Sequence, residues 1–493
     1  MPCIWPLSDM TKPGNRSEPK DSHNTAAIFR GHLAEKLIGG SITRSSADGG
    51  GYYLLKIALF SIFAVPSSMV LEPIGAAGSV PMLLALSLFA VWVASSIFGL
   101  HNPLEDKHPG RFALGALVIA TCFSYVAMFS GWTGGSNITT RAAADRWLLL
   151  IAASAGLMLT VTHAARSVDG ILRIVRPFVA GAVVCSAIAA IQFTLRMNPV
   201  EWIQQAMPGF TYNGGDTTFQ VRGTFLRVAG TTFTSIELAV VSAMVLPLAI
   251  WRALYDPKGT KLMHWLGCAL LAFSMVATVS RSSILALVIS ILVFFPFLST
   301  LARKWATLII PIVGTLVFLA IPGMVTTLTG SLFSGTSDPS ISTRTNNYPR
   351  VARMIDDNPL LGLGPGNYIP DFAIYFLDNQ YLNAAVTLGL VGMSATILYF
   401  AAPAVSTAVA ACSLKDPALK CFAGAVTAGI SVAVACSLTF DSLSFPVFAL
   451  AFPVLSGLGG VAWNLARGRP AHKHKLSSAT TSTRKYNRRK VGT

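Results

Sequence analysis

Leu382-Asn383-Ala384-Ala385-Val386-Thr387-Leu388-Gly389-Leu390-Val391-Gly392 opens a stretch, residues 382–412, that contains no charged side chain. About 20 predominantly apolar residues are enough for a helix to cross the hydrocarbon core of a membrane. Comparable apolar runs occur along most of the chain, and together they predict twelve spans: 54–71, 80–99, 112–130, 147–163, 171–194, 236–253, 262–279, 283–299, 305–322, 382–412, 421–438 and 445–465. The tenth run is long enough to contain a break, for which Pro403 is the candidate.

The composition supports this interpretation. Hydrophobic residues make up 53% of the 493 residues and charged residues 12%, and the mean hydropathy is +0.59. A soluble domain carries about 25% charged residues, and a membrane β-barrel would show short alternating segments instead of long apolar runs. The sequence therefore predicts an all-α integral membrane protein with about twelve transmembrane helices.

The positive charges predict the orientation in the membrane. The five loops on the side of the N-terminus hold 12 Lys and Arg in 52 residues, whereas the six opposite loops are together more than twice as long and hold nine. By the positive-inside rule, both termini are expected in the cytoplasm. The expected location is the inner (plasma) membrane.

The two termini differ from the apolar region between them. Residues 1–53 are polar and predict a mostly disordered cytoplasmic tail, 54–466 form the membrane domain, and 467–493 form a second cytoplasmic tail. Nine cations and no acid lie between Arg467 and Lys490, and they account for much of the net charge of +16. In a membrane protein, such a tail favours contact with anionic lipids, so nucleic acid is not an expected partner.

The outer side carries arginine but no lysine or histidine. The two long outer loops are 195–235 and 323–381, and loops of that length are usually functional or disordered. A guanidinium group binds phosphate oxygens through two parallel hydrogen bonds, which suits a pyrophosphate, although single arginines could also cap helix ends. The nine outer cations are Arg141, Arg146, Arg196, Arg222, Arg227, Arg281, Arg344, Arg350 and Arg353. Without histidine, a general base on this side must be a carboxylate.

Three outer positions stand out beside the long loops. Arg281 lies in a corner so tight, Ser280-Arg281-Ser282, that a charge there is costly and favours a functional role over a helix-end arginine. Glu237 begins the sixth span, where it could bind substrate or simply complement the helix N-terminus. Asp441 lies before the last span and could bind substrate or cap a helix.

The second long loop contains two further stretches of interest. Residues 358–368 read Asn-Pro-Leu-Leu-Gly-Leu-Gly-Pro-Gly-Asn-Tyr, a composition for a rigid turn; no Lys-Ser/Thr follows, so it is not a nucleotide phosphate loop. Downstream, Asp378-Asn379-Gln380 lies at the mouth of the tenth span. An acid and an amide there suggest either a site or a helix cap.

Taken in order, four stretches resemble the bacterial O-antigen ligase and polysaccharide polymerase superfamily. They are Arg227-Val228-Ala229-Gly230-Thr231, Ser280-Arg281, residues 359–366, and Asp378-Asn379-Gln380-Tyr381-Leu382 followed by Leu388-Gly389-Leu390-Val391-Gly392. The resemblance implies a membrane glycosyltransferase that uses an undecaprenyl-pyrophosphate-linked glycan as donor and joins it to a glycan acceptor without a metal or other cofactor. Membrane lipids and glycan-export proteins are the other partners it implies.

The resemblance also implies roles for individual residues. Arg227 and Arg281 match arginines that the family uses around the donor pyrophosphate, and Asp378 stands where many members have histidine. Thr234-Ser235 likewise stands where relatives often show His-Pro. The pattern is similar to exopolysaccharide members of the superfamily.

From these observations we expect Asp378 to act as the base, with Glu237 as the second choice, and Arg227 and Arg281 to neutralise the leaving group. Substrate is expected to contact Glu237, Asn379, Arg344 and Asp441. The alternative function is a transporter or flippase of lipid-linked glycan, but the sequence lacks the internal repeat and intramembrane charges typical of that class.

Overall fold

The computed structural model describes residues 50–468 with the exception of 104–105, 134–135, 166, 215–219, 223–224, 279, 321–338 and 371–374. The predicted terminal tails, apart from a few residues next to the membrane domain, lie outside the described residues. The account below concerns the unit that begins at Gly50.

Each of the twelve predicted spans contains a helix. The helices are α2 (Gly50–Ala64), α3 (Val80–Ile97), α4 (Pro109–Phe129), α5 (Ile138–Ala164), α6 (Val168–Leu195), α8 (Ser235–Tyr255), α9 (Lys261–Ala277), α10 (Arg281–Phe294), α11 (Thr300–Ala320), α14 (Gln380–Ser413), α15 (Pro417–Cys436) and α16 (Pro446–Ala466). By length and composition, eight are able to cross a membrane: α3, α4, α5, α6, α8, α14, α15 and α16. The predicted all-α integral membrane class is therefore confirmed, although the first helix ends at Ala64 and not near Leu71 as predicted.

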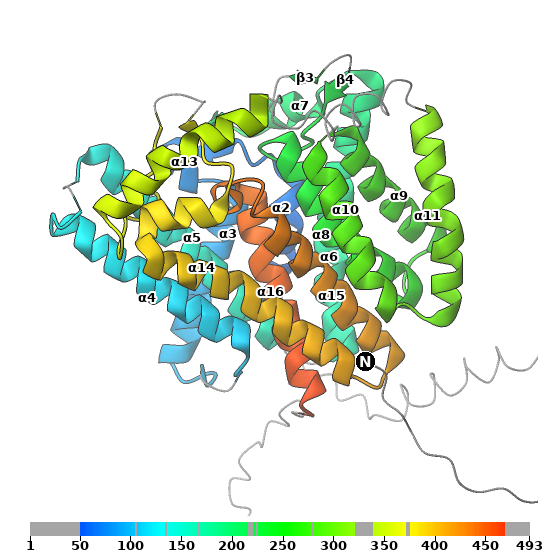
Figure 1. Cartoon of the computed structure of the whole chain (residues 1–493). Coiled ribbons are helices and arrows are strands. Elements are labelled where there is room, and N and C mark those ends of the chain that lie inside the picture. Colours follow the sequence, from blue (N-terminus) through cyan, green and yellow to red (C-terminus); the bar gives the residue numbers. More distant parts are fainter. Residues whose placement is uncertain are drawn as a thin grey trace, which may run out of the picture. The chain divides into compact units, whose positions relative to one another are not determined.

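The interior of the bundle is formed by α8, α15 and α16. In their most apolar windows, 78%, 72% and 89% of residues are buried, against 22% in α3. Figure 1 shows α16 running between α14, α8 and α15. Small residues allow these helices to approach closely: a Cβ at Gly429 of α15 would lie 2.5 Å from the Met244 carbonyl oxygen of α8.

The two predicted outer loops contain regular structure that the apolar pattern did not predict. The first holds α7 (Pro199–Gln205), β2 (Phe210–Tyr212), β3 (Gln220–Arg222) and β4 (Phe225–Arg227). Antiparallel pairing joins β2 to β1 (Met69–Leu71) and β3 to β4. The second loop holds α13 (Pro339–Asp357), an amphipathic helix at the same end of the bundle as β3, β4 and α7 (Figure 1).

Candidate active site

Arg227 and Arg281 come from different elements that meet at one corner. Arg227 ends β4, and its Nε donates a hydrogen bond to the Thr278 carbonyl oxygen at 3.2 Å. Thr278 closes α9, and Arg281 opens α10 three residues later. Arg227 thus contacts the chain two residues before the Ser280-Arg281 stretch, and both arginine side chains are partly exposed.

The corner at Arg281 is joined to the segment between α15 and α16. The hydroxyl oxygens of Ser282 and Thr439 lie 3.3 Å apart. That segment also binds the start of α14. The backbone N–H of Gln380 donates to the Ser437 carbonyl oxygen at 2.9 Å, and the side-chain Oε1 of Gln380 accepts from the backbone N–H of Leu443 at 2.6 Å. The arginine corner and the beginning of α14 are therefore connected through residues 437–444.

The capping hypothesis for the start of α14 applies to Asn379 and not to Asp378. The Asn379 side chain accepts hydrogen bonds from the Tyr381 and Leu382 amides at 2.9 and 3.2 Å, which satisfies donors that an isolated helix end would leave unpaired. This contact favours a structural role for Asn379 over substrate binding. Asp378 precedes the cap, and its side chain is exposed.

Asp441 is close enough to Asp378 for their charges to interact, and it is held by two polar side chains. Its Oδ2 accepts from Asn383 Nδ2 at 2.6 Å and from the Ser444 hydroxyl at 2.5 Å, and it makes no side-chain cap bond to the short 3-10 turn Ser442–Ser444 that follows. Its Oδ1 is buried and has no hydrogen-bond partner among the described residues. Burial raises the pKa of Asp441 to about 6; the Asp378 charge adds to the increase, whereas Ser444, Asn383 and Arg146 oppose it.

Glu237 occupies the interior of the bundle. Its side chain is fully buried, and its Oε1 accepts from the Val447 and Phe448 amides of α16 at 2.7 and 3.0 Å. Its Oε2 accepts from the Phe233 amide at 2.8 Å. A carboxylate so enclosed caps the first turn of α16, which favours a structural role over substrate contact.

Helix α14 is broken inside the Leu388-Gly389-Leu390-Val391-Gly392 stretch. Gly389 has φ +70° and ψ −173°, a conformation that essentially only glycine adopts. The break lies at Gly389 and not at Pro403, where the sequence suggested one. It leaves backbone groups on either side without helical partners.

The turn at residues 358–366 supplies those missing partners. The Leu363 and Gly364 amides donate to the Val386 and Thr387 carbonyls, both at 2.9 Å, and the Leu390 amide donates to the Pro359 carbonyl at 2.8 Å. A Cβ at Gly389 would lie 2.2 Å from the Leu360 carbonyl oxygen. Non-helical backbone within a membrane protein requires such internal pairing, and the last two of the four stretches therefore form one structural unit.

Helix α13 carries three of the outer arginines. The backbone of Arg344 is helical, whereas its side chain, predicted to bind substrate, lies outside the described part of the chain. The Arg350 guanidinium lies over the Tyr375 ring at 4.1 Å from its centroid. Arg353 is exposed and bonds weakly to its own helix.

The structure adds to the cluster two residues that the sequence did not single out: Asn383, and Arg146, which was named only as one of the nine outer arginines. The positive charge of Arg146 in α5 interacts with the Asp441 carboxylate, and the Asn383 side chain donates a hydrogen bond to it. Asn383 could have been noticed as an amide one turn inside an apolar span, a costly position without a partner. Arg146 had no local signal, because only the packing of α5 near the α15–α16 connection gives it significance.

The architecture and this cluster define an integral membrane protein with arginines and carboxylates gathered at one end of its helix bundle. Residues 266–397 match the family model described as O-antigen ligase. The match confirms the resemblance to the O-antigen ligase and polysaccharide polymerase superfamily and contains Arg281, Arg344, Asp378 and Asn379. This match supports, in general terms, a membrane glycan ligase or polymerase of glycosyltransferase type. No curated protein sequence shows significant similarity to the chain.

Proposed function

We propose that this protein transfers an undecaprenyl-pyrophosphate-linked glycan to a hydroxyl of a glycan acceptor at the outer face of the plasma membrane. The observation that carries the proposal is the contact between Arg227 and Thr278. It brings an arginine from outside the matched residues to the corner that holds Arg281 inside them.

The two arginines would act on the leaving group. During transfer, the acceptor oxygen bonds to the anomeric carbon while the bond between that carbon and the pyrophosphate oxygen breaks, and the electron pair leaves on the pyrophosphate. Arg227 and Arg281 would stabilise this developing charge electrostatically. Because the guanidinium groups supply the positive charge, the proposed reaction needs no metal ion, and activity is expected to persist in a chelator.

A carboxylate would take the proton from the acceptor hydroxyl. Asp378 is the first choice because its side chain is exposed and can reach a substrate outside the bundle. Asp441 replaces Glu237 as the second choice, because its charge interacts with that of Asp378 and its pKa of about 6 is close to neutral pH. Asn383 and Ser444 would orient Asp441 in either case.

The fate of the glycan in a deletion strain distinguishes the proposed transferase from a flippase. Loss of chain length with single repeats retained at the surface indicates a polymerase, and loss of attachment with free polymer retained indicates a ligase. Accumulation of the lipid-linked glycan on the inner leaflet would show that the protein moves its substrate instead of joining it, and the proposal would be rejected.

A further inference from the structure

The stretch that carries Arg227 is held against helix α6 by one side chain, that of Gln192. Gln192 is buried near the end of α6 that leads into α7. Its Oε1 accepts from the backbone N–H of Gly230 at 2.8 Å, and its Nε2 donates to the Gly230 carbonyl oxygen at 3.3 Å. Satisfying both backbone groups in this way requires a side chain with an acceptor and a donor on separate atoms, as an amide has.

The backbone of Gly230 also fits closely against α6. Gly230 has φ +60°, and a Cβ there would lie 2.8 Å from the Cys185 carbonyl oxygen. Because Cys185 and Gln192 are about two helical turns apart, they lie on the same face of α6. The helix backbone therefore limits how closely Gly230 can approach, and the Gln192 amide fixes where along the helix it lies.

Two buried residues connect Gly230 to Arg227. Val228 and Ala229 are buried, and on their far side Arg227 Nε donates to the Thr278 carbonyl oxygen at 3.2 Å. A segment this short spans at most about 10 Å even when fully extended. A displacement of Gly230 is therefore expected to move the backbone of Arg227.

The same amide joins helix α7 to this segment. Gln192 Nε2 also donates to Asn198 Oδ1 at 2.9 Å, and Asn198 Nδ2 donates to Glu201 Oε1 at 3.1 Å. Asn198 immediately precedes α7, and Glu201 lies in its first turn. Both polar atoms of Gln192 are thus bonded within the protein, which favours a role in positioning over contact with substrate.

We propose that Gln192 is a positioning residue for Arg227 in the transfer reaction. The inference rests on the proposed role of Arg227 at the leaving pyrophosphate. Gln192 holds Gly230, and through it Arg227, at the corner between Thr278 and Arg281. Electrostatic stabilisation of a transition state depends on charges that are already in place, so a displaced Arg227 loses much of its effect although it is still present.

Gln192→Leu tests the proposal, because leucine is similar in size and makes neither hydrogen bond to Gly230. In the transfer assay we expect kcat to fall about 10-fold to 100-fold, as when a catalytic group is misplaced, with the KM for the acceptor changed by less than about twofold. Gln192→Asn keeps the amide but is one methylene shorter. It should lower kcat in the same direction, and it takes the place of the leucine variant if that variant does not fold.

A double-mutant cycle with Arg227→Gln separates positioning from a general effect. If Gln192 acts through Arg227, Gln192→Leu should change the rate by less than about twofold once the arginine has been removed. An equal loss in both backgrounds would overturn the inference and leave the proposed role of Arg227 intact. No transfer by the wild type, or normal transfer by Arg227→Gln, would reject that role and the inference with it.

Hydrogen exchange reports on the segment independently of activity. The backbone amides of residues 226–229 should exchange about 3-fold to 10-fold faster in Gln192→Leu than in the wild type, the effect of about one lost hydrogen bond. Gln205→Leu makes the same change at an exposed position of α7 and should leave these amides unchanged. Unchanged exchange in Gln192→Leu would overturn the inference whatever its transfer rate.

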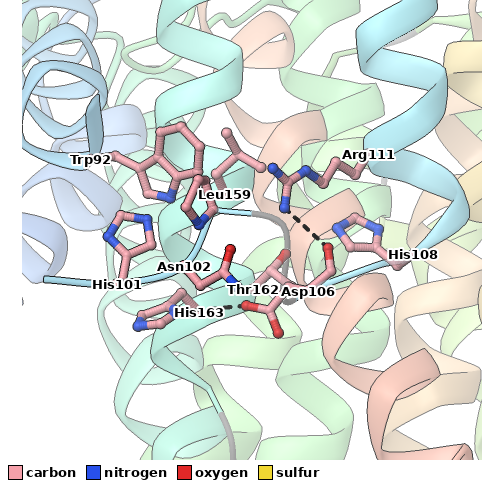
Figure 2. Close-up of a pocket in the computed structure, with 10 residues that line it drawn as sticks. Trp92, His101, Asn102, Asp106, His108, Arg111, Leu159, Thr162 and His163 are labelled. Carbon is pink, nitrogen blue, oxygen red and sulfur yellow. Dashed lines mark hydrogen bonds and ion pairs between the residues drawn. The ribbon is translucent and has the colours of Figure 1, made fainter. Parts of the chain in front are cut away.

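Arg111→Gln is the control for a general loss of stability. Arg111 lies near the start of α4, where its Nη1 donates to the Asp106 carbonyl oxygen at 3.1 Å, beside the pair of His163 and the Asp106 carboxylate (Figure 2). Helix α6 begins shortly after His163, and roughly 35 Å of helix separates its start from Gln192. Arg111→Gln should lower thermal stability and leave exchange at residues 226–229 unchanged. Equally faster exchange there in both variants would assign the effect of Gln192→Leu to lost stability and overturn the inference.

Discussion

Arg281 gives the most specific expectation at the scale of single residues. Its role in the proposal depends on two parallel hydrogen bonds to phosphate, which lysine cannot make although it keeps the charge. Arg281→Lys is therefore expected to lose most of the transfer activity, about 10-fold to 100-fold for the loss of a charge-assisted pair. Transfer from lipid-linked donor is the measurement, at matched amounts of protein in the membrane.

Arg353→Lys provides the matched control for Arg281. It makes the same chemical change at an exposed outer arginine whose Nε donates to a carbonyl of its own helix. Activity should stay normal in this control. Normal activity in Arg281→Lys as well would make Arg281 a residue of topology and not of catalysis.

Asp378 can be tested without disturbing the helix that follows it, because Asn379 makes the cap. Asp378→Asn should lower the transfer rate by roughly 100-fold or more, as is typical when a general base is removed. Asp378→His should recover part of this loss, since imidazole accepts the same proton. The control Asn379→Asp retains a capping oxygen and is expected to fold normally.

The pH profile distinguishes the two candidate bases. Below about pH 6, Asp441 takes up a proton, so a reaction that uses it as base loses activity as the pH falls through that value. If Asp378→Asn remains active and keeps the acid limb near pH 6, whereas Asp441→Asn loses roughly 100-fold of the rate, the base is Asp441.

The sequence indicated candidate residues without showing their environment. Residue type and order were enough to single out Arg227, Arg281 and Asp378, which the structure brings to one end of the bundle. Residue type and order were not enough to show that Glu237 caps α16, because the Val447 and Phe448 amides that it binds lie 210 and 211 positions away in the chain. Arg146 was named only as one of nine outer arginines for the same reason, since its relation to Asp441 depends on long-range packing.

At the scale of elements, the broken helix α14 and the turn at 358–366 act as one unit. Gly389→Ala would place a side chain in a backbone conformation reserved for glycine and against the Leu360 carbonyl oxygen. We expect a cost of about 1–3 kcal/mol from the backbone alone, with further cost from the clash. Thermal unfolding in detergent and transfer activity should both decrease.

Gly115→Ala is the control for this substitution. Gly115 lies within α4, and a Cβ there meets nothing within 4 Å. Alanine should be neutral or slightly stabilising there, by up to about 1 kcal/mol. Equal stability of the two variants would show that the break does not require glycine.

Apolar length predicted the membrane helices but not the elements around them. Each of the twelve runs contains a helix, and eight of these helices are long and apolar enough to cross a membrane. Helix α13 is polar on average and the strands have three residues each, so neither left a signal in a hydropathy pattern. The break in α14 was predicted at Pro403, but a helix can contain proline where neighbours satisfy the freed carbonyl, and the glycine conformation depends on the docked turn.

For the whole molecule, the orientation follows from the predicted distribution of positive charge. In a cysteine-free background, cysteines at positions 215 and 340 should react with an impermeant thiol reagent in intact cells, and a cysteine at 258 should not. Labelling at 258 alone would reverse the predicted orientation and move the arginine cluster to the cytoplasm.

The central claim is glycosyl transfer from a pyrophosphate-linked lipid, and reconstitution tests it most directly. Purified protein in liposomes, supplied with an undecaprenyl-pyrophosphate-linked oligosaccharide and a glycan acceptor, should release undecaprenyl pyrophosphate in proportion to the glycosidic bonds formed. The reaction should continue in a chelator and fall to background in a variant that lacks both Arg227 and Arg281. Movement of the donor between leaflets without any new glycosidic bond, at normal folding of the protein, would contradict the account.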